Sequence, residues 1–213
     1  MDYITILICF FELDNFFVTY RRRQMTDTII IGGGQTGRGF IGRLLFESGI
    51  PFTILDKNSE LIDALNRKGN YRVRFFSERA PMTVTDFEAY ETDSPQALEA
   101  VKNAKNIFIS VGTENLETAS RYLLEHHANP KNVILCENAA EQSRVVRDVL
   151  KKGMDYTAIH FVETAVFCKS LDAGDGSFDI FSEGNHKLIY DVKNARGSFF
   201  RTPFLCRKII FRC

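Results

Sequence analysis

The amino-acid sequence predicts an α/β fold with a doubly wound, mostly parallel sheet. Short runs of β-branched and other apolar residues alternate along the chain with segments of helical spacing. Many of these runs have no polar face, as is typical of strands that helices cover on both sides. Hydrophobic residues make up 45% of the 213 residues and charged residues 25%, a globular balance that excludes disordered and collagen-like chains.

Strands are expected where these apolar runs stop at turn residues. The runs cover residues 28–31, 51–56, 71–76, 82–87, 107–111, 133–136, 156–161, 178–182 and 188–192. In the third run, Tyr71, Val73 and Phe75 alternate with two arginines, which is typical of an edge strand. Residues 82–87 are expected to pair with that strand.

Helices are expected between most of the strands, over residues 40–49, 59–69, 94–103, 116–127 and 139–152. Gly49 and Gly69 end the first two, since glycine readily takes the left-handed conformation of a helix C-terminus. Ser94 and Pro95 open the third, because serine caps the first turn and proline is tolerated within it. Helical spacing fades after about residue 153.

The two ends of the chain differ from this alternating core. Residues 1–24 form the most apolar stretch of the chain, but Glu12, Asp14 and Asn15 interrupt its apolar run, so no membrane span is predicted. The three arginines at 21–23 follow that run instead of preceding it, so no signal peptide is predicted either. We expect a dispensable, disordered extension, with a membrane-surface anchor as the alternative. Residues 195–213 carry five basic and no acidic residues. A poorly ordered tail is expected there, with an RNA or lipid contact as the alternative, and residues 25–194 form the predicted domain.

The charge and cysteine content restrict the partners. Lys+Arg and Asp+Glu both number 27, so the chain lacks the basic excess of a nucleic-acid-binding domain. The five cysteines form no C-x-x-C pair, and the four histidines do not share ligand spacing, so no metal site is predicted. Unpaired thiols favour a cytoplasmic location.

A glycine-rich loop between the first strand and the first helix predicts dinucleotide binding. Gly32 permits the tight turn, Gly34 lets the backbone approach a pyrophosphate, and Gly37 allows close helix–strand packing. Asp56 ends the second strand, where a carboxylate accepts both hydroxyls of an adenosine ribose. It would repel a 2′-phosphate, so NAD is predicted over NADP despite the adjacent Lys57. The predicted fold is therefore Rossmann-like.

Residues after two later strands complete the candidate site. Val111, Gly112 and Thr113 lie where a dinucleotide would cross the sheet. The expected cofactor-binding residues are Gly32, Gly33, Gly34, Gln35, Thr36, Gly37, Arg38, Gly39, Asp56, Val111, Gly112 and Thr113. Glu137 and Asn138 follow another strand at the same edge. The Asn138 amide either donates a hydrogen bond to a reacting carbonyl or caps the next helix.

Several segments resemble the mannitol dehydrogenase family of long-chain polyol dehydrogenases. They are GGGQTGRGFIGRLL at 32–45, ILDKNSELIDALN at 54–66, ISVG at 109–112, CENAAE at 136–141, HFVETAV at 160–166 and IFSEG at 180–184. The resemblance covers about residues 28–192, and its most specific part is the glycine-rich run at 37–42. It implies hydride transfer between NAD and a polyol phosphate, with fructose 6-phosphate and mannitol 1-phosphate as the family's pair.

The resemblance also implies a division of the active site. Family members place a lysine base and an Asn/His pair in a helical C-terminal substrate domain, which is absent from the elements predicted here. Where the family continues with an Asp-Arg pair, this sequence has Phe167 and Cys168. We therefore expect a truncated, weakly active NAD-binding portion, with Glu163 or His160 as candidate internal bases. A sheet face left uncovered is expected to promote self-association.

Two other functions remain open at this point. One is a non-catalytic NAD(H)-binding or redox-sensing module, and the other is a related dehydrogenase acting on another polyol or sugar acid.

Overall fold

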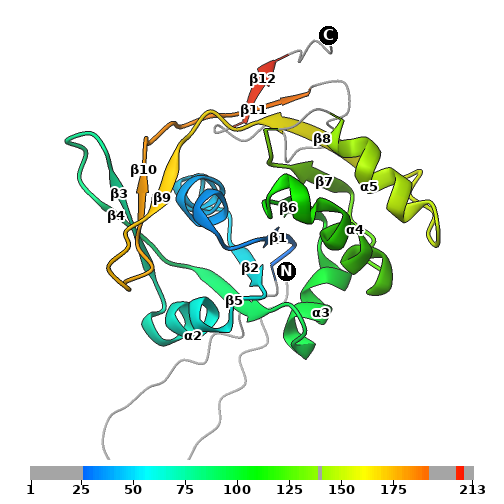
Figure 1. Cartoon of the computed structure of the whole chain (residues 1–213), viewed down its shortest axis with the longest axis horizontal. Coiled ribbons are helices and arrows are strands. Elements are labelled where there is room, and N and C mark those ends of the chain that lie inside the picture. The colour runs from blue at the N-terminus through cyan, green and yellow to red at the C-terminus, as the bar shows by residue number, and fades with distance from the viewer. Residues whose placement is uncertain (1–25, 139–140, 192–204, 209–213) are drawn as a thin grey trace, which may run out of the picture.

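The structure, a computed structural model, describes residues 26–138, 141–191 and 205–208. Its described part holds an eight-stranded sheet of order β12-β11-β8-β7-β6-β1-β2-β5 and a four-stranded sheet of order β4-β3-β10-β9 (Figure 1). The strands are β1 (Thr28–Ile31), β2 (Phe52–Asp56), β3 (Tyr71–Phe75), β4 (Met82–Val84), β5 (Phe87–Glu91), β6 (Asn106–Ile109), β7 (Asn132–Leu135), β8 (His160–Ala165), β9 (Ser170–Asp172), β10 (Ile180–Ser182), β11 (Leu188–Asp191) and β12 (Leu205–Lys208). The helices are η1 (Gly37–Gly42), α1 (Arg43–Glu47), α2 (Ser59–Lys68), α3 (Pro95–Asn103), η2 (Thr113–Asn115), α4 (Leu116–Glu125) and α5 (Gln142–Leu150).

The large sheet is wound in both directions from β1. β1 pairs in parallel with β2 on one side and with β6 on the other. The chain first runs outward through β2 and β5, then returns to β6 and continues through β7 and β8, all in parallel. Only beyond β8 does an antiparallel pairing occur in the described part of this sheet, between β8 and β11. The doubly wound, mostly parallel sheet is therefore confirmed, with its switch point between β1 and β6.

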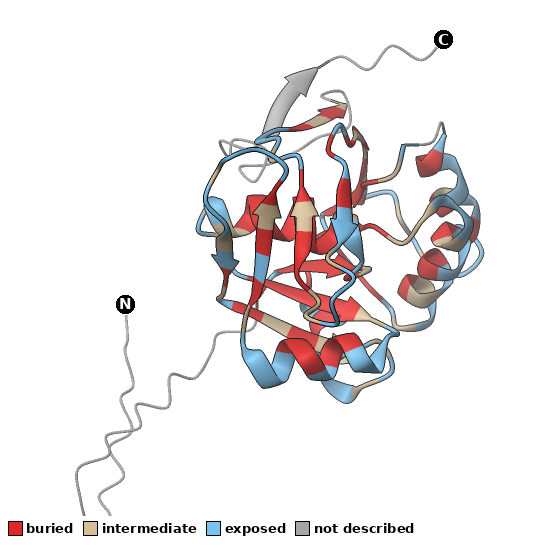
Figure 2. Ribbon diagram, turned by 60° about the vertical axis from the view of Figure 1, so that its left-hand side comes forward, coloured by how far each residue is buried: buried red, intermediate tan, exposed pale blue. Residues whose placement is uncertain are grey.

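Successive residues of each central strand belong to different cores. Ile30 and Phe108 face the layer made by η1, α1, α2 and the small sheet. Ile29, Ile31 and Ile107 face the layer made by α3, α4 and α5. Buried and exposed residues alternate along α2, α3, α4 and α5, so that each of these helices turns its apolar side to a sheet, whereas η1 is buried along its whole length (Figure 2). Burial on both faces explains why the strands read as unbroken apolar runs.

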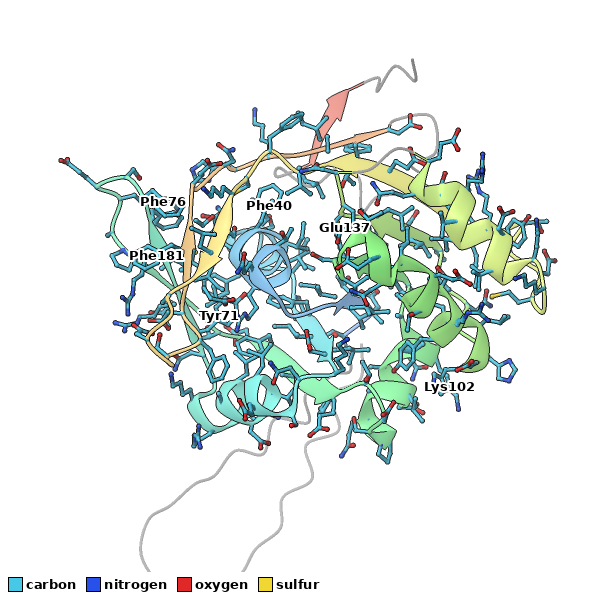
Figure 3. The ribbon with its side chains drawn as sticks, viewed as in Figure 1. Phe40, Tyr71, Phe76, Lys102, Glu137 and Phe181 are labelled. Carbon is cyan, nitrogen blue, oxygen red and sulfur yellow. The ribbon has the colours of Figure 1, made fainter. Side chains whose placement is uncertain are left out.

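The small sheet corrects the prediction of an edge strand at residues 71–76. β3 is an inner strand, because it pairs antiparallel with β4 and in parallel with β10. Part of the outer surface of the small sheet is aromatic. Phe76 and Phe181 stack with ring centroids 5.9 Å apart, and Phe76 is 52% exposed (Figure 3). Phe167, just before β9, is 63% exposed. The predicted self-association stays a prediction.

Two strand predictions were wrong in their limits. The single strand predicted at 82–87 is divided at Asp86, whose φ of +58° breaks the extended backbone, and only its last residue, Phe87, belongs to β5 of the large sheet. The strand predicted at 156–161 lies four residues later, as β8. Both errors arose in segments that mix apolar and polar residues, where the hydrophobic pattern alone does not fix the ends of a strand.

No helix follows α5 among residues 151–191 and 205–208, where the described elements are β8 to β12. The helical C-terminal substrate domain is therefore not present in the described chain. The predictions for residues 1–24 and for most of 195–213 lie outside the described residues. Residues 205–208 are the exception, since their backbone forms β12, which pairs in parallel with β11.

Candidate functional site

A cleft of about 780 Å³ opens at the carboxyl ends of β1, β2 and β6. This is the switch point of the large sheet, the place where open α/β sheets bind ligands. The cleft is lined by Ile31, Gly32, Gly34, Gln35, Thr36, Leu55, Asp56, Lys57, Thr92, Asp93, Ser110, Val111, Gly112, Glu114, Asn115, Thr118, Ala119, Arg121, Tyr122, Glu125 and Glu137. Its volume lies within the range of small-molecule sites, roughly 300–1,000 Å³.

The loop between β1 and η1 is packed so tightly that two positions admit only glycine. Gly32 has a φ of +99°, and a Cβ there would lie 2.0 Å from the carbonyl oxygen of Ser110. A Cβ at Gly37 would lie 1.9 Å from the carbonyl oxygen of Gly32. Gly34 differs, because no atom lies within 4 Å of the position that its Cβ would take. The backbone at Gly34 is thus open to a ligand, while its neighbours hold the loop in place.

Asp56 joins the end of β2 to this loop. Its Oδ2 accepts a hydrogen bond from the backbone N–H of Gly33 at 2.6 Å, and its Oδ1 accepts one from the N–H of Asn58 at 2.9 Å. The side chain lines the cleft and is half-buried. An ionised carboxylate offers about four acceptor positions, so the two bonds leave room for hydroxyl groups of a ligand.

The opposite wall of the cleft is held together by Glu137, directly after β7. Its Oε1 accepts a hydrogen bond from the backbone N–H of Gly112 at 2.9 Å. This bond extends the contact between β6 and β7 beyond the last backbone pair of their ladder. Burial and the nearby Glu114 raise the pKa of Glu137, against the lowering effect of the Gly112 N–H. Sequence reasoning noted Glu137 at this edge without assigning it a role; the signal was an acidic residue directly after an apolar strand.

Seven of the predicted cofactor-binding residues line the cleft: Gly32, Gly34, Gln35, Thr36, Asp56, Val111 and Gly112. The other five do not: Gly33, Gly37, Arg38, Gly39 and Thr113. Gly33 and Gly37 shape the loop from behind it, whereas Thr113 starts η2.

Gly39 packs η1 against the small sheet and lies away from the cleft. A Cβ at this position would lie 2.3 Å from Cγ2 of Ile180 in β10. One turn later, a Cβ at Gly42 would lie 2.5 Å from the hydroxyl of Tyr71 in β3. The glycine spacing that follows the loop therefore serves helix–sheet packing, and contact of Gly39 with a cofactor stays a prediction.

Arg38 is likewise buried under the small sheet, with only 2% of its surface exposed. Its Nη2 binds Oδ1 of Asp172 in β9 at 2.9 Å, and the side chain of Gln35 donates to the same carboxylate at 3.2 Å. Burial lowers the pKa of Arg38, and the charge of Asp172 opposes that effect. Arg38 thus ties the glycine loop to β9, so its contribution to any cofactor contact is indirect.

Asn138 lies just beyond Glu137 and is bound to the backbone of another segment. Its Nδ2 donates to the carbonyl oxygen of Val166, and its Oδ1 accepts from the N–H of Val166, both at 2.9 Å. The alternative that Asn138 caps the next helix is wrong, because Glu141 precedes α5. Polarisation of a substrate carbonyl by Asn138 stays a prediction, and it requires this amide to exchange its partner.

The two candidate internal bases are both placed for other roles. His160 pairs with Asn132 at the amino end of the sheet, on the edge opposite the cleft. Glu163 is nearer, but its Oε1 accepts hydrogen bonds from both the backbone N–H and the hydroxyl of Ser143, at 3.1 and 2.6 Å. Because Ser143 lies in the first turn of α5, Glu163 acts as a cap for that helix.

We expect Glu163→Ala to lower the free energy of unfolding by about 1–2 kcal/mol, because it leaves the buried Ser143 donors without this acceptor. Urea denaturation followed by circular dichroism measures the change. Glu163→Gln is the matched control, since it keeps a side-chain oxygen and should lose less. An unchanged midpoint for Glu163→Ala would contradict the capping role.

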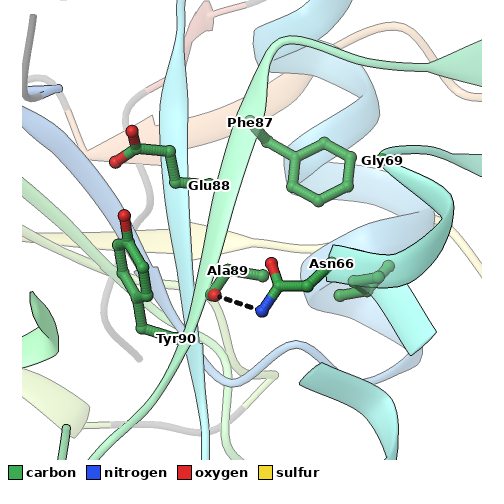
Figure 4. Close-up of a pocket in the computed structure, with 7 residues that line it drawn as sticks. Asn66, Gly69, Phe87, Glu88, Ala89 and Tyr90 are labelled. Carbon is green, nitrogen blue, oxygen red and sulfur yellow. Dashed lines mark hydrogen bonds between the residues drawn. The ribbon is translucent and has the colours of Figure 1, made fainter. Parts of the chain in front are cut away.

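A second, smaller hollow of about 150 Å³ lies between α2 and β5 (Figure 4). The side-chain amide of Asn66 crosses it and donates to the carbonyl oxygen of Ala89 at 3.0 Å. The hollow is smaller than small-molecule sites usually are, and we assign it no ligand.

Within 26–138, 141–191 and 205–208, no three His, Cys, Asp or Glu side chains gather as metal ligands would. The same residues contain no helix that is long and apolar enough to cross a membrane.

Known proteins resemble this chain over more than half of its length. The model of the mannitol dehydrogenase Rossmann domain matches residues 26–171. Mannitol-1-phosphate 5-dehydrogenase of Shouchella clausii is 37% identical over 157 residues, which cover 70% of this chain and 40% of that protein. The enzyme of the same name from Thermoanaerobacter pseudethanolicus is 32% identical, with 67% and 39% covered. This chain thus spans about two fifths of the length of these relatives.

Solved structures with low sequence identity share the fold. Octopine dehydrogenase, solved with NADH and L-arginine, superposes with a TM-score of 0.63 at 13% identity, covering 85% of this chain and 48% of the other. D-mandelate dehydrogenase, solved with NADH, gives a TM-score of 0.56 at 14% identity, with 79% and 48% covered.

Proposed function

The chain belongs to the mannitol dehydrogenase family and carries its Rossmann domain, and from this premise we propose that it is the NAD-binding portion of a polyol-phosphate dehydrogenase. The proposed pair of substrates is fructose 6-phosphate and mannitol 1-phosphate, as the names of its relatives suggest. The observation that carries the proposal is the open backbone at Gly34 beside the free acceptor positions of Asp56.

The residues of the cleft fit a dinucleotide. The loop from Gly32 leads into η1 and α1. The N–H of Arg38 bonds the carbonyl oxygen of Gly34 at 3.0 Å, but no side chain caps the first turn of η1, which supports a pyrophosphate at this helix start. Asp56 accepts the ribose hydroxyls on the β2 side of the cleft. When bound, NAD supplies the hydride acceptor, and the chain's own residues hold and orient it. Cys136 and Cys168 are free thiols, which is compatible with the proposed cytoplasmic location.

The direct test of this proposal is a titration of the 213-residue chain with NADH, followed by nicotinamide fluorescence, beside the same titration with NADPH. Saturable NADH binding, with weaker NADPH binding, is the expected result. Absence of NADH binding would remove the cofactor assignment and the proposed function with it.

We expect Asp56→Ala to weaken NADH binding by about 1–2 kcal/mol, the scale of one or two hydrogen bonds to a charged group. The preference over NADPH should narrow, because the charge that repels a 2′-phosphate is gone. Fluorescence titrations with both cofactors measure the two effects.

Lys57→Ala is the neighbouring control. Lys57 also lines the cleft and carries the opposite charge, so its loss should not weaken discrimination against NADPH. Equal NADH affinity in Asp56→Ala and the parent would contradict the role given to Asp56.

A further inference from the structure

The charged side chains of the cleft are mainly acidic. The acidic lining residues are Asp56, Asp93, Glu114, Glu125 and Glu137, and the basic ones are Lys57 and Arg121. Lys57 lies beside Asp56 at the β2 end, and the guanidinium of Arg121 is paired with Glu117. Beside Gly112, where the chain leaves β6, the charged lining residues are Glu114 and Glu137.

These two carboxylates flank the backbone of Gly112. Glu137 accepts its N–H at 2.9 Å. A Cβ added to Gly112 would lie 2.5 Å from Oε1 of Glu114, so the Glu114 side chain is folded over the same residue. Figure 3 shows Glu137 near the middle of the molecule, beyond the end of β7. The wall of the cleft at Gly112 is therefore flanked by two carboxylates.

The proposed mode of binding places the nicotinamide half of the cofactor on this side. Asp56 takes the adenosine ribose over β2, and the glycine loop takes the pyrophosphate over β1. The remaining half must then extend across the switch point toward β6 and β7. Its ring is a pyridinium cation in NAD⁺ and is uncharged in NADH, so a nearby carboxylate acts differently on the two forms.

We propose that Glu137 is a specificity-determining residue that favours the oxidised over the reduced cofactor through the charge of its carboxylate. This inference rests on the proposed function, because it requires a nicotinamide cofactor in the cleft. Its hydrogen bond with Gly112 fixes the carboxylate at the wall, so the charge acts from a set position.

The pH dependence expected for this preference has a definite sign. The pKa of Glu137 lies above the ordinary value of a glutamate, chiefly because of burial, and the charge of Glu114 on η2 adds to the effect. The carboxylate is charged above that pKa and neutral below it. The preference for NAD⁺ should therefore be present above that raised pKa and fade as the pH falls through it.

Glu137→Gln tests the proposal, because the amide oxygen can still accept the Gly112 N–H while the charge is lost. We expect its affinity for NAD⁺ to fall about five- to tenfold, with the affinity for NADH nearly unchanged, as the loss of one nearby charge in a partly solvated cleft implies. NADH binding is measured by fluorescence, and NAD⁺ binding by displacement of NADH.

Glu141→Gln is the matched control. Glu141 is an exposed residue four positions away that pairs with Arg144 and does not line the cleft. Because both variants replace one glutamate by glutamine, they have the same net charge. Its ratio of NAD⁺ to NADH affinity should equal that of the parent. Thermal unfolding of all three proteins checks that each is folded.

The outcomes separate this inference from the proposed function. If the parent binds NADH and Glu137→Gln changes both affinities equally, or neither, the charge of Glu137 does not set the preference and the inference is wrong. If the parent binds neither form, the proposed function itself fails.

Discussion

Gly37→Ala should destabilise the protein by about 4 kcal/mol or more, a large fraction of the total stability of an ordinary domain. The added methyl group would lie 1.9 Å from the carbonyl oxygen of Gly32, a residue fixed by the hydrogen bond of its N–H to Leu55 of β2 and by close packing against Ser110. Neither partner is a flexible side chain that could move aside. Urea denaturation of the purified variant, or its failure to fold, provides the measurement.

Gly34→Ala is the matched control in the same loop. Its Cβ would meet no atom within 4 Å, and its φ is not positive, so the free energy of unfolding should stay the same or rise by up to about 1 kcal/mol. NADH binding should nevertheless fall at least about tenfold, because the methyl group occupies the approach of the pyrophosphate. If Gly37→Ala and Gly34→Ala were both as stable as the parent and bound NADH with unchanged affinity, this description of the loop would be wrong.

The second large effect concerns turnover. We expect the 213-residue chain to bind NADH while it reduces fructose 6-phosphate about 10²–10⁴-fold more slowly than the usual enzyme range of roughly 1–10³ s⁻¹. Hydride transfer to a ketone requires a proton donor at the substrate oxygen. His160 lies at the amino end of the sheet, opposite the cleft, and the carboxylate of Glu163 is bound by Ser143. The family resemblance places the base in a helical domain that the described residues lack.

NADH oxidation with excess fructose 6-phosphate, followed at the absorbance of NADH, measures the rate. Glu163→Gln is the informative companion variant, since a loss of any residual rate would identify Glu163 as the base after all. Turnover within the usual enzyme range would contradict the expectation. Binding without turnover would agree with an NAD-binding portion and also with a sensor of the NAD redox state.

The large sheet could be predicted because its strands stand out in the sequence as local apolar runs. Residues 28–31, 52–56 and 133–135 are apolar runs bounded by turn residues, and each lies where expected. The small sheet could not be predicted in the same way. One of its strands, β9, has three residues, too few for a pattern to stand out, and β10 covers only the last three residues of the strand predicted at 178–182. Its central pairing joins Val73 to Ile180, and no local periodicity encodes a contact between such distant segments.

Part of the candidate site could likewise be predicted, because some of its residues form a local sequence motif. Gly32, Gly34 and Asp56 stand at spacings that the chemistry of a dinucleotide dictates, so the sequence alone indicated them. Gly39 and Arg38 stand in the same motif, yet they contact β10 and β9, which only the long-range pairing of the small sheet brings next to them. The hydrogen bond from Gly112 to Glu137 spans two strands, and only the structure reveals it.

The parallel pairing of β3 with β10 has a consequence for the order in which the protein folds. Val73 and Ile180 close a loop of about a hundred residues, which costs more chain entropy than the contacts between neighbouring strands of the large sheet. The small sheet should therefore assemble late, after β6, β7 and β8 have bridged the gap. Because η1 contacts both β9 and β10, the helix that follows the glycine loop gains its full support only at that step. The cleft would thus become able to bind a ligand only late in folding. A bound ligand would in turn slow any unfolding that begins with the small sheet.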